Sequence, residues 1–118
     1  MQPDARDAAH LWDMLAAARE AHAVVDGITA EQFLADRIRL RALERMLELV
    51  GEAARRVTPA CQVAHPEIPW RALIGQRNLL VHEYGRINPG LLYVAAVERA
   101  PQLIEALERI VGGDAQIR

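Results

Sequence analysis

Lysine is absent from this sequence, and all 14 of its basic residues are arginine. With 16 acidic residues the formal charge is −2, which excludes a broadly basic surface for bulk nucleic-acid binding. Any contact with a nucleic acid must therefore be local. Cysteine is almost absent as well. Cys61 stands alone, so an intrachain disulfide is excluded and a reducing compartment is expected.

Long apolar runs are also missing. No apolar stretch approaches the roughly 20 residues that a membrane span needs, and no charged-then-apolar leader opens the chain. We therefore expect a cytoplasmic protein without membrane association. One cysteine and four histidines without clustering give no metal-site signature, so neither a metal nor a cofactor is expected.

Aromatic residues are few, with two Trp, two Tyr and one Phe, and β-branched residues form few runs. Alanine and leucine are abundant instead, which favours helix over sheet. A chain of 118 residues is long enough for one core. We therefore expect an all-α protein with a single domain over residues 1–118.

Capping and proline signals predict four main helices. Thr29-Ala30-Glu31-Gln32 matches a capping box, and Asn88-Pro89 is a cap and first-turn pair. Pro101 lies inside the last helix and should kink it. The expected helices run from Asp4 or Asp7 to about Asp26, from Ala30 to Arg56, from Pro69 to about Gly85, and from Pro89 to about Val111. With residues 58–69 as a connector containing one short turn, this order predicts an up-and-down bundle.

The second expected helix has an apolar band wider than one neighbouring helix requires. The width suggests two contacts, one within the subunit and one to a second subunit. The other side alternates arginine and glutamate at helical spacing, which is typical of a solvated face. The band consists of Leu40, Leu43, Met46, Leu47, Val50, Ala53, Ala54 and Val57.

The most informative stretch is residues 76–84, Gln-Arg-Asn-Leu-Leu-Val-His-Glu-Tyr. On a helix, Arg77 and Tyr84 fall in the middle of the apolar face. An arginine there needs a partner, which is either a buried carboxylate or a bound anion. The stripe that contains them also includes Trp70, Ile74 and Val81, and the neighbouring stripe carries Arg71, Gly75, Asn78 and His82.

These residue types suit the cleavage of RNA without a metal ion. Such a reaction needs a base for the 2′-hydroxyl proton, an acid for the leaving oxygen and a cation for the charged phosphorane. His82 can fill either proton-transfer role, Arg77 is a fork-shaped phosphate binder, and Asn78 can orient the ring or contact phosphate. Arg77 and His82 differ by about 140° around an ideal helix. Their convergence therefore requires the length of the arginine, a distortion of the helix or a second subunit.

Structural roles are open alternatives for the same residues. Arg77 could form a buried pair with a glutamate of the second helix, and His82 could be a satisfied core or surface histidine. Tyr84 could pack with its hydroxyl at the rim, and Gly75 could simply permit close approach of a helix. Structural roles are expected for the remaining candidates, which are His10, His22, His65 and Cys61.

Arg77, His82 and Tyr84 form the pattern Arg-x4-His-x-Tyr, which resembles the signature of the HEPN superfamily and most of all its HepT branch. The likeness is made specific by the position of the motif after a Pro-Glu-Ile-Pro-Trp segment, which ends at Trp70. The resemblance covers nearly the whole chain and includes Asp7, Leu11-Trp12-Asp13, Thr29, Phe33, Val50-Gly51-Glu52-Ala53-Ala54 and His65-Pro66-Glu67-Ile68-Pro69-Trp70.

HepT proteins are toxins paired with a minimal nucleotidyltransferase (MNT) antitoxin. The resemblance implies a helical-bundle homodimer, formed through the motif helix, that cleaves RNA without a metal ion. By the same resemblance Arg77 and His82 are catalytic and Asn78 assists them. Tyr84 matches the tyrosine to which the antitoxin adds AMP units, and such phosphates would block the cleft. Gly85 and Asn88 depart from the aromatic and acidic residues that relatives often have there.

Our leading hypothesis is therefore a toxin endoribonuclease of a type VII-like toxin–antitoxin system, neutralised by AMP addition to Tyr84. The first alternative is a non-catalytic module that docks a nucleotidyltransferase and binds a nucleotide or RNA in the same groove. The second is a plain dimeric helical bundle in which Arg77 has only a structural role.

Overall fold

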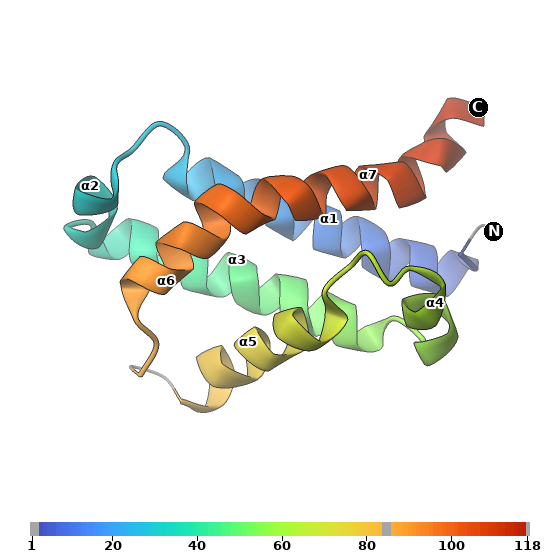
Figure 1. Cartoon of the computed structure of the whole chain (residues 1–118), viewed down its shortest axis with the longest axis horizontal. Helices are drawn as coiled ribbons and strands as arrows, with labels where there is room; N and C mark the ends of the chain where they lie inside the picture. Colours follow the sequence, from blue (N-terminus) through green and yellow to red (C-terminus); the bar gives the residue numbers. More distant parts are fainter. Residues whose placement is uncertain (1–2, 84–85, 118) are drawn as a thin grey trace.

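The computed structural model describes residues 3–83 and 86–117, and every regular element in these ranges is helical. Four long units follow one another along the chain, the last of them composite, in the up-and-down arrangement of Figure 1. The all-α prediction is confirmed. The elements are α1 (Ala5–Val25), α2 (Ala30–Leu34), α3 (Arg37–Arg56), α4 (Pro59–Ala64), α5 (Trp70–His82), α6 (Pro89–Val94), the π-helical turn η1 (Ala95–Arg99) and α7 (Ala100–Ile117).

The capping residues act as their sequence patterns predict. Asp4 accepts a hydrogen bond from the Asp7 amide at 2.8 Å and so begins α1. At α2, Thr29 and Gln32 form both bonds of the capping box, at 3.1 and 2.9 Å. Asn88 caps α6, and Pro89 follows in its first turn. Each of these signals is local, which is why the sequence alone was sufficient.

The prediction of one continuous helix from Ala30 to Arg56 is wrong. The chain leaves the helix at Ala35, and Asp36 accepts a hydrogen bond from the Arg39 amide at 3.1 Å to begin α3 as a new helix. The short α2 packs against α6, where the rings of Phe33 and Tyr93 lie 5.5 Å apart. Burial of Phe33 at this contact favours the break over one straight helix.

The last helix also differs from its prediction. Its irregularity is the π turn of η1, which lies just before Pro101. Proline lacks the N–H that an α-helix would direct to the carbonyl four residues earlier, and a π turn is one way to accommodate the lost bond. The helix then continues past Val111 to Ile117. Glycine at 112 lowers helix propensity by about 1 kcal/mol without forbidding the helix.

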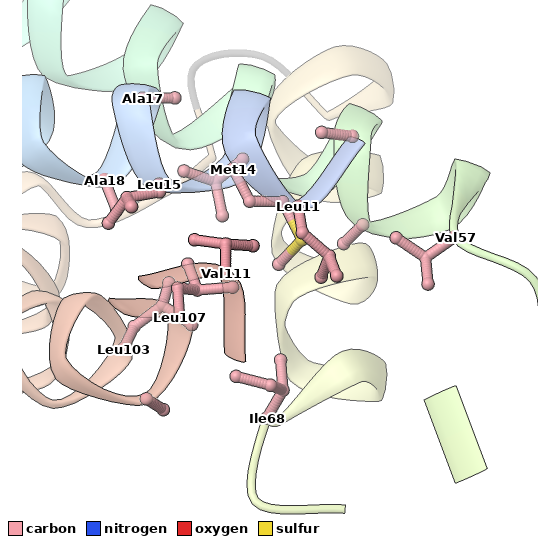
Figure 2. Packing of buried hydrophobic residues seen from close by; sticks show 14 of the residues in the cluster. Leu11, Met14, Leu15, Ala17, Ala18, Val57, Ile68, Leu103, Leu107 and Val111 are labelled. Carbon is pink, nitrogen blue, oxygen red and sulfur yellow. The ribbon is translucent and has the colours of Figure 1, made fainter. Parts of the chain in front are cut away.

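The bundle has the packing order α7–α1–α3–α5. Figure 2 shows Leu103, Leu107 and Val111 of α7 facing the buried side chains of α1, with Ile68 closing the core beneath them. The wide apolar band of α3 is used within the chain, because α3 packs against α1 on one side and α5 on the other. A second subunit is therefore not needed to explain that width. The helix that carries the motif, α5, lies at one end of this order, and α7 lies at the other.

None of the helices in the described part of the chain combines the length and the apolar character that a transmembrane span requires.

Candidate active site on α5

Arg77 lies where α5 approaches α3 most closely. Gly51 of α3 is buried opposite it, and a Cβ atom on Gly51 would collide with the Arg77 Cβ and lie 2.7 Å from the Leu73 carbonyl oxygen. Only glycine therefore fits at this position. The sequence suggested Gly75 for such an approach, but a Cβ there would meet no other described atom within 4 Å. The glycine contact within the chain is at Gly51.

The guanidinium of Arg77 is held but not saturated. Its side chain is 12% exposed, and its Nη2 lies 3.8 Å from Glu52 Oε1 on α3. Nη1 donates a hydrogen bond to Asn78 Oδ1 at 3.1 Å. Nε is buried and has no hydrogen-bond partner among the described residues. Arg77 therefore does have a glutamate of the second expected helix as its partner, but the ion pair is long. Most of the five N–H donors of the guanidinium remain unused.

Asn78 and His82 lie on the exposed side of α5. Asn78 turns its oxygen toward Arg77, and because arginine only donates hydrogen bonds this orientation of the amide follows from its partner. Among the described residues the Asn78 NH₂ group has no acceptor, so it can donate to another group. The contact to Arg77 was not foreseen, since the sequence pointed Asn78 toward His82 or a phosphate.

The structure does not bring Arg77 and His82 together within one chain. Arg77 is directed into the α3–α5 contact, whereas His82 is exposed at the last turn of α5. No hydrogen bond or ion pair joins their side chains in the described part of the molecule. The angular separation expected from the helix is therefore preserved. Tyr84 and Gly85 lie outside the described residues.

Apolar side chains accompany His82 on the outer surface of α5. Leu79 is 46% exposed and Val81 is 39% exposed. Val81 was expected on the packed stripe with Arg77, so that stripe is only partly covered at this end of the helix. The exposed side of α5 thus combines a histidine, an amide and apolar surface.

A groove of about 400 Å³ lies on another side of α5, between α5 and the η1–α7 segment. Its floor is apolar and includes Leu47, Val50 and Leu73, while Gln76 and Arg99 contribute polar groups. Leu47 and Val50 come from α3 and Leu73 from α5, and Ala18 and Ala21 of α1 also line the groove. Neither Arg77 nor His82 lines this groove, so it is distinct from the motif surface.

Asp7 is a buried carboxylate whose burial the sequence did not reveal, since it entered only as a possible cap and as part of the family resemblance. Its side chain accepts two hydrogen bonds from Thr58, from the amide at 2.9 Å and from the hydroxyl at 2.7 Å. Burial favours the neutral acid, but these bonds, with His10 and Arg6 nearby, prevail and lower the pKa of Asp7. Asp7 therefore ties the start of α1 to the start of α4.

Two of the other candidates, Cys61 and His65, have structural surroundings. Burial, with Asp7 and Asp4 nearby, raises the pKa of the Cys61 thiol, which keeps the thiol protonated and unreactive. The carbonyl of His65 accepts a hydrogen bond from Trp70 Nε1 at 2.9 Å and so fixes the entrance to α5. Within residues 3–83 and 86–117, no three His, Cys, Asp or Glu side chains gather as a metal site.

Comparisons with known proteins match this chain to ribonucleases. The family described as Ribonuclease HepT-like matches residues 14–110. A protein named "Probable ribonuclease HepT" from Thermococcus cleftensis is 34% identical over 70% of this chain and 76% of its own length. Candidate RNases from Caldanaerobacter subterraneus subsp. tengcongensis and Methanocaldococcus jannaschii are 31% and 30% identical. These matches cover 74% and 85% of this chain, and 78% and 92% of the relatives.

No solved structure matches the chain significantly. The family match covers most of the chain and includes the whole of α5, on which the Arg-x4-His motif lies. The resemblance that the motif suggested is thereby confirmed, and the chain belongs to the HepT-like ribonuclease family.

Proposed function

We propose that this protein is a toxin-type endoribonuclease that cleaves RNA without a metal ion, with Arg77 and His82 as catalytic residues and Asn78 assisting. The observation that carries the proposal is the state of Arg77. A cation that is largely buried, whose nearest carboxylate forms only a 3.8 Å ion pair and which retains unused donors, is suited to bind a phosphate. Membership of a ribonuclease family supplies the class of reaction.

The chemistry assigns a separate role to each side chain. Arg77 neutralises the charge that develops on the phosphorane, and the free NH₂ of Asn78 donates to a phosphate oxygen beside it. His82 is exposed to solvent and accepts or returns the proton of the 2′-hydroxyl or the leaving oxygen. One histidine cannot act as base and acid at once, which favours two chains contributing to one cleft.

The proposed active form is therefore a homodimer that packs through α5. Two features support it: the exposed apolar side chains Leu79 and Val81 next to His82, and the failure of a single chain to bring His82 to Arg77. The packing order leaves α5 at the outside of the bundle, where a second copy can reach it. A dimer of this kind offers two arginines and two histidines to one RNA strand.

Growth arrest tests the proposal in cells. Expression of the parent should stop growth, whereas Arg77→Ala and His82→Ala should relieve the arrest while the purified variants remain folded. His22→Ala and Arg55→Ala are matched controls away from the motif and should stay toxic. Toxicity equal to the parent in both motif variants contradicts the assignment of the two residues.

Tyr84 is the proposed regulatory site, at which an MNT-type nucleotidyltransferase antitoxin adds AMP. The phosphates would bring negative charge to the motif surface and compete with RNA for Arg77. After co-expression with such a transferase, the intact mass of the protein should rise by one or more AMP units, and Tyr84→Phe should abolish the rise. Tyr93→Phe is the matched control and should leave it intact, because the Tyr93 hydroxyl already donates to the Ile28 carbonyl at 2.6 Å. An adduct that persists in Tyr84→Phe excludes this site.

A further inference from the structure

The partners of the α3 glutamates are not alike. Glu44 pairs with Arg41 at 2.9 Å, and Glu48 pairs with Arg45 at 2.7 Å, so both carboxylates take an arginine of their own helix. Glu52 continues the same four-residue spacing but pairs across to Arg77 on α5. At 3.8 Å this contact is an ion pair without a hydrogen bond. The only cross-helix pair of the three is thus also the loosest.

Gly51 and Glu52 are adjacent in the sequence and act on different parts of Arg77. Because Gly51 has no side chain, the Cβ of Arg77 can pack directly against α3. Glu52 faces the far end of the side chain, at Nη2. Asn78 Oδ1 accepts a hydrogen bond from Nη1 at 3.1 Å. Contacts at Cβ, Nη2 and Nη1 therefore fix the position of the Arg77 side chain.

The length of the Glu52 contact has a chemical consequence. A carboxylate in close bidentate contact would occupy the same N–H donors that a phosphate needs. A site without any carboxylate would leave a largely buried cation uncompensated, and the side chain would turn toward solvent. A carboxylate at 3.8 Å compensates the charge and leaves the donors available.

We propose that Glu52 is a positioning residue for Arg77, which holds the guanidinium in the α3–α5 contact with its donors free for a phosphate of the RNA. The inference rests on the proposed function, because it assumes that Arg77 binds the reacting phosphate. Glu52 itself does not touch the RNA. It acts only through Arg77, and its removal should affect catalysis more than substrate binding.

The test compares Glu52→Gln with Glu48→Gln. Both changes remove one negative charge from α3, but Glu48 contacts Arg45 and not Arg77. With a fluorogenic RNA oligonucleotide, Glu52→Gln should lower kcat by about ten- to a hundredfold, which is the cost of a misplaced catalytic group. KM should change less than about twofold, because the lost interaction acts in the transition state. Glu48→Gln should match the parent in both constants. Glu52→Asp keeps the charge but withdraws it by one methylene, and it should give an intermediate kcat.

A second measurement reports on Arg77 without any activity. The Nε–H of a buried arginine gives a protected cross-peak in a ¹H–¹⁵N spectrum, and the loss of one such peak in Arg77→Lys assigns it. Glu52→Gln should shift this peak and speed its exchange with water, whereas Glu48→Gln should leave it in place. An unchanged peak in Glu52→Gln overturns the proposal, and so does a kcat loss that Glu48→Gln shares. If the parent cleaves no RNA, the proposed function fails, while the spectrum still decides whether Glu52 holds Arg77.

Discussion

At the scale of single residues, Asp7 and Arg77 are charges of opposite sign that are largely removed from solvent and are compensated differently. Asp7, 3% exposed, is met by two hydrogen bonds from Thr58. Arg77 has one hydrogen bond, from Nη1, and a distant carboxylate. Both carboxylate oxygens of Asp7 accept a hydrogen bond from the fold, whereas Arg77 has N–H donors left over that can bind a ligand. This difference is the physical basis for assigning a structural role to one and a catalytic role to the other.

The role of Asp7 can be tested through the pH dependence of stability. Because its pKa in the folded chain lies below the ordinary value of 3.8, Asp7 contributes stability above that pH and loses the contribution as pH falls through the lowered value. Asp7→Asn should cost about 1–3 kcal/mol of unfolding free energy at neutral pH, through loss of hydrogen bonds to a charged acceptor. The difference from the parent should shrink in acid.

Chemical denaturation at pH 7 and pH 3 measures the loss of unfolding free energy in Asp7→Asn and its decrease in acid. Asp13→Asn is the control, because Asp13 is an exposed carboxylate on the same helix, and it should behave as the parent at either pH. A constant difference between Asp7→Asn and the parent across this range would show that the carboxylate charge plays no part.

Much of the candidate site could be predicted from residue spacing, because spacing on a helix determines which side of it a residue occupies. The stripe placed Arg77 toward the interior, and the structure buries it against α3. Spacing could not show which of several glutamates would face it, nor at what distance. Those depend on how far apart two helices lie, which is determined at Gly51. The turn of Asn78 toward Arg77 is likewise a side-chain choice that periodicity does not encode.

At the scale of elements, the contact between α3 and α5 places the motif, and Gly51 controls it. Gly51→Ala should destabilise the protein by about 1–3 kcal/mol, because the added methyl group meets backbone and the fixed end of Arg77. Gly112→Ala on α7 is the matched change, since a Cβ there meets no other described atom within 4 Å. It should stabilise by about 0.5–1 kcal/mol through helix propensity.

Thermal unfolding of the two variants separates the effects. The two shifts should have opposite signs, with the midpoint lowered for Gly51→Ala and raised for Gly112→Ala. Equal changes in the unfolding midpoint of the two variants would mean that the close approach at Gly51 does not contribute to stability.

The elements themselves were predictable where their ends carry local signals, as at Asp4, Thr29 and Asn88. The break before α3 was not predicted, because it depends on the packing of Phe33 against Tyr93, which are 60 residues apart in sequence. Pro101 correctly predicted an irregularity in this part of the last helix, but the sequence predicted a kink and not a π turn. In both cases a tertiary contact or a backbone adjustment overrode a continuous helical pattern.

At the scale of the whole molecule, the packing order α7–α1–α3–α5 separates two surfaces of the motif helix. One side of α5 is fixed to α3 and holds Arg77 in place. The other is open and carries Asn78 and His82 beside apolar side chains. Rigid support on one side and an open surface on the other are what a site shared between two copies requires. The packing order follows from contacts among all the helices, so residue patterns alone could not establish it.

The central claim is that Arg77 and His82 together cleave RNA without a metal ion. The most direct measurement is cleavage of a labelled RNA oligonucleotide by the purified protein in excess EDTA, followed on a sequencing gel. The parent and His22→Ala should cleave the RNA. Arg77→Ala and His82→Ala should lose about two orders of magnitude or more in rate, as expected for removal of a general acid–base or an oxyanion-stabilising group. Cleavage that disappears on chelation, or that survives in both motif variants, would contradict this claim.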